Sequence, residues 1–234
     1  MVLRPRYSVP FAVVLAVAAL LGACAAVPIE GSSSPASVGA ATSLTNGLIV
    51  FVGSDASGQA QVFTIMPDGS AKTQLTQSPG GDAYPAWSRD GTRIAFTSMR
   101  TGAPELWSMR ADGSNQTQLT APPASGNFVP SWSPDGAQIA FSSVRTGHPE
   151  IWVMNADGGN QRQLTATSFD SNAPSWSPDG SKIAFASNRS GVTEVYTMNL
   201  DGSGVQQLTA PDGSSFPDSN VPVWSPDGTK LAFW

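Results

Sequence analysis

The sequence predicts an all-β fold, a β-propeller built from four-stranded blades, with about four blades in this chain. Three observations predict it. A motif centred on Trp recurs every 44 to 48 residues, the runs within each unit alternate with a period of two, and Asp-Gly turns separate them. A propeller blade consists of four short strands in a unit of ~45 residues, which these units match.

The first two strands of each unit follow from the Trp motif. Each Trp has Pro two residues before it, Ser-x-Asp-Gly directly after it, and Ile-Ala-Phe or Leu-Ala-Phe a few residues later. The motif recurs four times, at Trp87, Trp132, Trp176 and Trp224. An earlier copy of the second strand, Ile49-Val50-Phe51, lacks the Trp half. We therefore expect one strand ending at each Trp and a second strand at each Ile-Ala-Phe.

The third and fourth strands follow from alternation and from a turn. Trp107 and Met109 share one face of the third strand, while Leu106 and Ser108 share the other, which suits a sheet covered on both faces. An Asp-Gly pair comes next, and Gln-Leu-Thr follows it. Asp-Gly is a strong hairpin signal because Gly supplies positive φ and Asp bonds its own backbone.

These runs resemble the TolB-type propeller repeat, and the resemblance covers residues 48–234. It rests on four motifs recurring in order: a WSPDG-type turn, IAF, an E-[LIV]-[WY] strand and QLT. The resemblance implies stacked blades that form a closed ring in the bacterial cell envelope. It also implies docking of an envelope protein, such as the peptidoglycan-associated lipoprotein. TolB carries an α/β domain before its propeller, whereas a short tether precedes the repeats here.

The number of strands leaves the closure of the propeller open between two alternatives. The chain supplies strands two to four of a first unit, three full units, and then a Trp strand with a second strand. In the first alternative, residues 221–224 pair with residues 48–52 and close a four-bladed ring. In the second, the chain is an incomplete larger propeller that is truncated after Trp234 or needs a partner.

Residues 1–23 read as a lipoprotein signal peptide. Arg4 and Arg6 precede an apolar run that is too short to span a bilayer, and small residues then lead to Cys24. Leu21-Gly22-Ala23-Cys24 resembles a bacterial lipobox, which implies lipidation of Cys24 and attachment of the exported protein to the cell envelope. The alternatives are a plain signal peptide with an incidental Cys and an uncleaved anchor. Residues 24–47 then form a flexible tether.

Composition argues against several function classes. A formal net charge of −5 argues against nucleic acid, which needs a basic face. One His and one Cys nearly exclude a zinc site, and no cofactor motif occurs. The Ser after each Trp has no His base, so we expect no catalytic residues.

Three Arg that precede a Glu by five residues predict loop-to-strand ion pairs within each unit: Arg100, Arg145 and Arg189. His148 is expected to be surface decoration.

The segments leading into each Trp strand vary while the framework does not, so we expect specificity there. The predicted docking residues for a partner protein or peptide are Asp82, Tyr84, Asn127, Phe128, Asn172 and Asn220. The alternative is that the Asx side chains cap the strand starts.

The function predicted from these features is a non-enzymatic envelope lipoprotein whose propeller binds a protein partner. The alternative is the gating propeller of a prolyl-oligopeptidase-like hydrolase, which requires a catalytic domain outside this sequence. A metal-assisted polysaccharide lyase needs several His ligands, and this chain has one.

Overall fold

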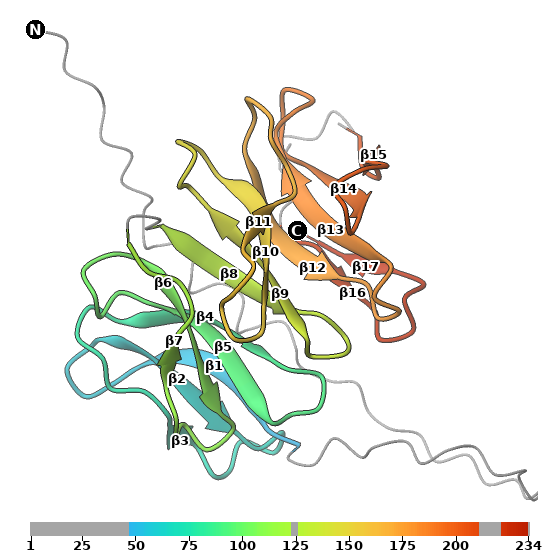
Figure 1. Cartoon of the computed structure of the whole chain (residues 1–234). Helices are drawn as coiled ribbons and strands as arrows, with labels where there is room; N and C mark the ends of the chain where they lie inside the picture. Colours follow the sequence, from blue (N-terminus) through green and yellow to red (C-terminus); the bar gives the residue numbers. More distant parts are fainter. Residues whose placement is uncertain (1–46, 123–125, 211–220, 234) are drawn as a thin grey trace, which may run out of the picture. The chain divides into compact units, whose positions relative to one another are not determined.

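The computed structural model describes residues 47–122, 126–210 and 221–233. The chain divides into two units, residues 1–41 and residues 42–234, and every described residue belongs to the second. The described residues form 17 β-strands and no helix, so the all-β prediction is confirmed for this part of the chain (Figure 1).

The strands form five separate antiparallel sheets, which follow the sequence in order. We name them the first to fourth blades and the fifth sheet. The first blade contains β1 (Ile49–Ser54), β2 (Ala60–Ile65) and β3 (Thr73–Gln74). The second contains β4 (Asp82–Trp87), β5 (Arg93–Ser98), β6 (Glu105–Arg110) and β7 (Thr117–Gln118). The third contains β8 (Asn127–Trp132), β9 (Gln138–Ser143), β10 (Glu150–Asn155) and β11 (Arg162–Gln163). The fourth contains β12 (Ser171–Trp176), β13 (Lys182–Ser187), β14 (Glu194–Asn199) and β15 (Gln206–Gln207). The fifth sheet contains β16 (Val223–Trp224) and β17 (Leu231–Ala232).

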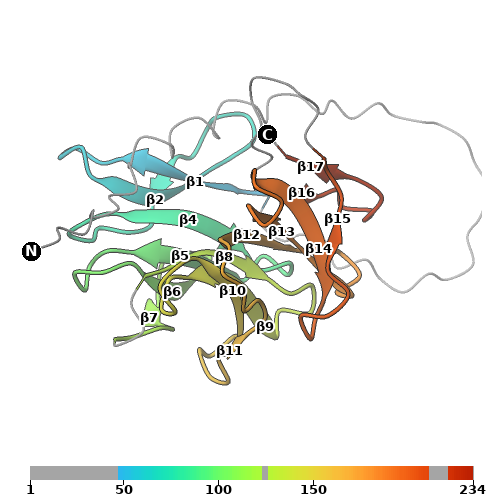
Figure 2. The same ribbon diagram turned by 90° about the horizontal axis from the view of Figure 1, so that it is seen from above.

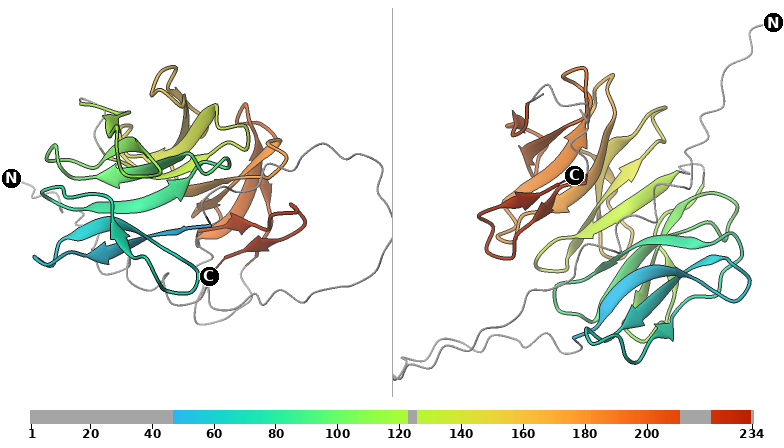
Figure 3. Two further views of the ribbon diagram at one scale, coloured as in Figure 1. Left: turned by 90° about the horizontal axis from the view of Figure 1, so that it is seen from below. Right: turned by 180° about the vertical axis from the view of Figure 1, so that it is seen from behind.

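The prediction of three full units flanked by two partial ones is confirmed. Of the two alternatives for closure, the one in which residues 221–224 pair with residues 48–52 is not formed. Residues Val223 and Trp224 pair with Ala232 and Leu231 of their own hairpin, and β1 pairs with β2. Within the described residues, no strand pairing joins 221–224 to 48–52 (Figure 3). The reason is local, because β17 immediately follows β16 and occupies the hydrogen-bonding edge that β1 would need.

The sheets are stacked one on the next (Figure 2). The hydrophobic core is made of side chains from neighbouring blades and lies between them. At the junction of the second and third blades, the small aliphatic face of one sheet packs against the aromatic and long side chains of the next. Ala95, Leu106 and Leu119 meet Trp132, Ile139, Phe141 and Met154. The third and fourth blades repeat this pattern. The alternation predicted for a sheet covered on both faces is therefore confirmed in the second to fourth blades.

Asp-Gly turns join the third and fourth strands as predicted. In the first of them, Gly69 has φ of 85°, and Asp68 Oδ1 accepts a hydrogen bond from the Ser70 amide at 2.9 Å. Two residues after each Gly the chain again takes positive φ, at Ala71, Asn115, Asn160 and Gly204. Three of these four residues are Asn or Gly, which tolerate that conformation, and Ala71 is the exception.

The Ser-x-Asp-Gly turns join the first and second strands. In the fourth blade the Ser177 hydroxyl donates to Asp179 Oδ1 at 2.6 Å and accepts from the Lys182 amide at 2.9 Å. The Ser177 hydroxyl and the Ser181 amide and hydroxyl lower the pKa of Asp179 to about 2. The serines of the repeat are therefore turn residues that hold the hairpin.

The innermost strand of each full blade contains a β-bulge. Its register with the second strand shifts by one residue, for example between Ala83 and Ala86. The residue before Pro in each of these strands has positive φ although it is not Gly: Tyr84, Val129 and Ala173. Val221, which precedes Pro222 ahead of β16, has the same conformation, and the four φ values run from 48° to 54°. β-Branched residues rarely adopt this conformation, so the surrounding fold must impose it. The bulge re-aims the side chain at this position.

Candidate protein-docking surface

The predicted docking residues lie where the innermost strands begin, and the structure first removes Asp82 from that surface. Its side chain is buried, and Asp82 Oδ2 lies 3.5 Å from Arg100 Nη2. Both residues belong to the second blade. Asp82 therefore neutralises a partly buried cation inside the fold.

Asn127 occupies the equivalent position of the third blade and is also buried. Its Nδ2 donates to Glu105 Oε2 of the preceding blade at 2.9 Å, and its Oδ1 accepts from Arg145 Nη2 at 2.9 Å. The amide thus relays hydrogen bonds between a carboxylate and a cation that belong to different blades. As with Asp82, this residue links framework elements and presents no free surface.

Asn172 is offset by one residue from this pair. Asp82 pairs with Ser98 and Asn127 with Ser143, and the residue that pairs with Ser187 in the fourth blade is Ser171. Side chains alternate along a strand, so Asn172 faces the opposite way from Asp82 and Asn127 and remains half-buried. Asn220 lies outside the described residues.

The predicted ion pairs between each Arg and the Glu five residues later are wrong. In the described residues these Arg do not lie within 4.0 Å of those Glu, and their neighbours are in other segments. Arg145 interacts electrostatically with Glu105 of the preceding blade, and Arg189 interacts in the same way with Glu150 of the blade before its own. Burial lowers the pKa of both guanidinium groups, and these carboxylates partly offset that effect. The prediction failed because the partners come from segments distant in sequence: Asp82 of the first strand of the same blade for Arg100, and a Glu of the preceding blade for Arg145 and Arg189.

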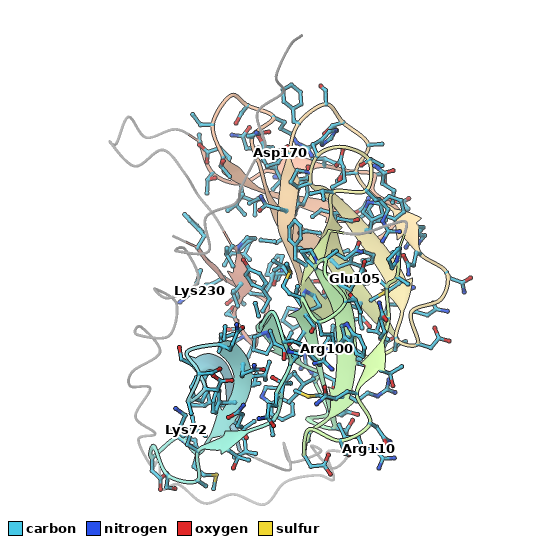
Figure 4. All side chains as sticks on the ribbon, turned by 90° about the vertical axis from the view of Figure 1, so that its left-hand side faces the viewer. Lys72, Arg100, Glu105, Arg110, Asp170 and Lys230 are labelled. Atoms are coloured by element: carbon cyan, nitrogen blue, oxygen red, sulfur yellow. The ribbon has the colours of Figure 1, made fainter. Side chains whose placement is uncertain are left out.

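Each Arg lies over an aromatic ring of the third strand. The guanidinium carbon of Arg145 lies 4.3 Å from the Trp152 ring centroid, within cation–π range. Arg145 Nε also donates to Ser143 Oγ at 2.8 Å, and Nη1 donates to Gln161 at 2.8 Å. Arg100 repeats these contacts over Trp107, and Arg189 stacks on Tyr196. Figure 4 shows Arg100 and Glu105 within the interior of the stacked sheets.

Sequence reasoning missed the residue that binds each buried Glu. Thr120 donates its hydroxyl to Glu105 Oε2, and the same hydroxyl accepts from the Leu106 amide at 2.9 Å. Thr165 repeats both contacts with Glu150 and Ile151. The signal was present, because Thr ends every Gln-Leu-Thr segment. In the first blade Gln61 replaces the Glu and accepts from Thr76 at 3.0 Å.

His148 is not the surface decoration that its single occurrence suggested. Its Nδ1 lies 3.8 Å from Glu150 Oε1 and 4.0 Å from Asp170 Oδ1, and its side chain is 31% exposed. It therefore lies, in the loop before β10 of the third blade, close to a carboxylate of its own blade and to one that directly precedes β12 of the fourth.

Tyr84 is the accessible aromatic side chain of the predicted set. It is 40% exposed and occupies the bulge of the second blade, where partial burial raises the pKa of its phenol. Phe128 is half-buried one strand position earlier in the third blade. We call the four bulge residues with positive φ the bulge row: Tyr84, Val129, Ala173 and Val221. The four residues share one backbone conformation and differ in side chain, and all except the buried Ala173 are at least partly exposed.

In the residues that the structure describes, no group of three or more His, Cys, Asp or Glu side chains is placed to hold a metal ion. Across the same residues, no helix has the length and hydropathy needed to cross a bilayer.

Comparisons with known proteins agree with this architecture. Residues 121–234 match the family model described as the TolB beta propeller domain. A curated TolB homolog from Chlorobium luteolum is 38% identical over 50 residues, which are 21% of this chain and only 12% of that protein.

Two solved structures are similar over most of the chain. A protein assigned as TolB from Agrobacterium tumefaciens has a TM-score of 0.69 and 26% identity, over 80% of this chain and 71% of that one. TolB from Acinetobacter baumannii has a TM-score of 0.69 and 23% identity, over 82% of this chain and 47% of that one, which shows a common fold. The chain thus has a β-propeller fold, and its residues 121–234 are similar to the TolB beta propeller domain.

Proposed function

Because this chain has a β-propeller fold similar to the TolB beta propeller domain, we propose that it is a non-enzymatic scaffold that docks a protein partner. The docking surface comprises Tyr84, Val129 and Val221 of the bulge row together with Phe128 and Asn172, where the innermost strands begin. Ala173 of the row is buried and is not part of that surface. The proposal also places the protein in the bacterial cell envelope, exported and attached through a lipid on Cys24.

One observation carries the docking proposal. A non-Gly residue with positive φ recurs at the bulge of the three full blades and directly ahead of β16, while its side chain changes from Tyr84 to Val129, Ala173 and Val221. Conformations of this kind cost about 1–3 kcal/mol each and concentrate at functional sites. The buried Asp82, Asn127 and Glu105 are committed to the junctions, and Ala173 is buried as well. Tyr84, Val129 and Val221 are therefore the varied part of this surface.

Site-specific photo-crosslinking in cells tests the docking surface. Benzoylphenylalanine placed at position 84 of the full chain is expected to form a protein adduct. The matched control is position 66, where Met66 is equally exposed but lies at a hairpin tip of the first blade. Equal adducts at both positions, or none at position 84, contradict the docking surface.

Lipid attachment is tested separately by metabolic labelling with an alkyne fatty acid. The full chain is expected to take up the label, and the Cys24→Ala variant is expected to lose it. Label retained by the variant would exclude Cys24 as the attachment site.

A further inference from the structure

Two arginines face each other across the second blade, at the end away from Tyr84. Arg93 of β5 is directly opposite Arg110 of β6. The Ala111 amide donates to the Thr92 carbonyl at 3.0 Å, so the next pair along the ladder, Arg93 and Arg110, is a non-hydrogen-bonded pair. Such pairs bring Cα atoms to about 4.5 Å and their side chains closest together. Figure 4 shows Arg110 at the opposite end of its blade from Glu105.

The other full blades avoid this arrangement at the same ladder position. The third blade places Gln138 opposite Asn155. The fourth places Lys182 opposite Asn199, and Lys182 Nζ donates to Asn199 Oδ1 at 2.8 Å. Like charges directly opposite each other destabilise a sheet, so the pair in the second blade carries an electrostatic cost that its equivalents lack.

The surroundings relieve that cost only in part. Within the described residues, no carboxylate oxygen lies within 4.0 Å of either guanidinium group. The nearby Asp90 and Asp112 are held in their turns by Ser88 and Ser114, with a smaller contribution from each Arg to their lowered pKa values. With its amide oxygen turned toward Arg110, Asn115 accepts two hydrogen bonds at 3.2 Å. The guanidinium of Arg93 lies 5.6 Å from the Trp132 ring centroid.

A concavity of about 550 Å³ opens beside the two arginines. Ser108 and Thr117 line it and are directly opposite each other on β6 and β7. The third blade has larger residues at these positions, Val153 and Arg162, and Arg162 reaches across to the Leu200 carbonyl at 2.9 Å. Small side chains therefore leave space beside the one cross-strand pair of cations among the three four-stranded blades.

We propose that this concavity, the Arg93–Arg110 site, binds an acidic segment of a partner protein. Each guanidinium presents donors that match a carboxylate, and a carboxylate between them removes the like-charge cost. A volume within the ~300–1,000 Å³ of ligand clefts suits several residues of a chain better than one inorganic anion. The site lies at the other end of the blade from the bulge row, so it is a second surface that does not depend on the docking surface.

Titration of the full chain with acetylated tetraglutamate at low ionic strength tests the site, with acetylated tetraglutamine as the uncharged control. The Arg93→Gln/Arg110→Asn variant installs the residues that the third blade already has, so it is expected to fold. Binding of tetraglutamate should weaken about tenfold or more in this variant, because two charge-assisted contacts are lost. Lys182→Gln, the matched change in the fourth blade, should alter binding less than about twofold. Thermal unfolding of each variant verifies its fold.

Three results would overturn the proposal. One is tetraglutamate binding that the double variant leaves unchanged, and another is equal binding of tetraglutamine. The third is binding of inorganic phosphate without binding of tetraglutamate, which would make the site one for free anions. None of these results changes the crosslinking expected at position 84, so the docking surface and the Arg93–Arg110 site are tested independently.

Discussion

Asn127 donates a hydrogen bond to Glu105 across the junction between the second and third blades, at 2.9 Å. The preceding junction has the opposite distribution of charge. There the position equivalent to Glu105 is the neutral Gln61, and the position equivalent to Asn127 is the charged Asp82. Each of these two junctions therefore contains one carboxylate from this pair of positions, close to one Arg.

This relationship predicts a charge-swap rescue. Asn127→Asp places a second buried carboxylate beside Glu105 and should lower the free energy of unfolding by about 3 kcal/mol, because one charge is left uncompensated. Adding Glu105→Gln recreates the Gln61 and Asp82 arrangement and should recover most of that loss. Urea unfolding of the two single variants and the double variant measures the coupling. Additive effects would show that the two positions do not interact.

Equivalent Phe residues should differ strongly in their contribution to stability. Phe141 is fully buried between the second and third blades, whereas Phe233, at the same position of the repeat, is 47% exposed. Phe141→Ala should cost about 3–5 kcal/mol through lost burial and a residual cavity. Phe233→Ala should cost less than about 1 kcal/mol. Denaturant midpoints that are equal for the two variants would contradict the packing between blades.

Ala71 offers a stabilising substitution. It has φ of 52° where the equivalent residues are Asn115, Asn160 and Gly204. Ala71→Gly should raise stability by about 0.5–1 kcal/mol, because Gly adopts positive φ without steric cost. The control is Ala56→Gly, at an exposed turn position without positive φ, where Gly adds only unfolded-state entropy and should lower stability. A lower melting temperature for Ala71→Gly would refute the conformational argument.

The Asp turns predict acid sensitivity. Asp179 and Asp227 have their pKa lowered from 3.8 to about 2, first by the hydroxyls of Ser177 and Ser225. A carboxylate with a lowered folded-state pKa contributes its stability in full above pH 3.8, and loses it as the pH falls toward 2. Ser177→Ala should therefore flatten the decline in stability between pH 4 and pH 2, measured by thermal unfolding across that range. An unchanged slope would mean that this turn does not contribute to acid unfolding.

The order of strands was predictable because it depends on local chemistry. Trp132 ends a strand, Asp135-Gly136 turns the chain, and Ile139-Ala140-Phe141 starts the next strand, all within ten residues. The site was less predictable. Asp82 and Asn127 were correctly identified as recurring polar residues at strand starts, but no pattern showed that their side chains are buried. Tyr84 was identified as a docking candidate, while the positive φ that sets its orientation was not.

The sequence by itself determined the repeat, the four strands of a full blade, their turns and the two apolar faces of each sheet, because these depend on neighbours within about 45 residues. Only the tertiary structure decided which blade supplies the partner of Arg145, and that β16 pairs with β17 and not with β1. It also decided that Asn172 faces away from the side that Asp82 and Asn127 share. Such outcomes depend on contacts between blades and on single-residue shifts along a strand. A shift of one residue reverses a side chain without changing the pattern from which the strand was predicted.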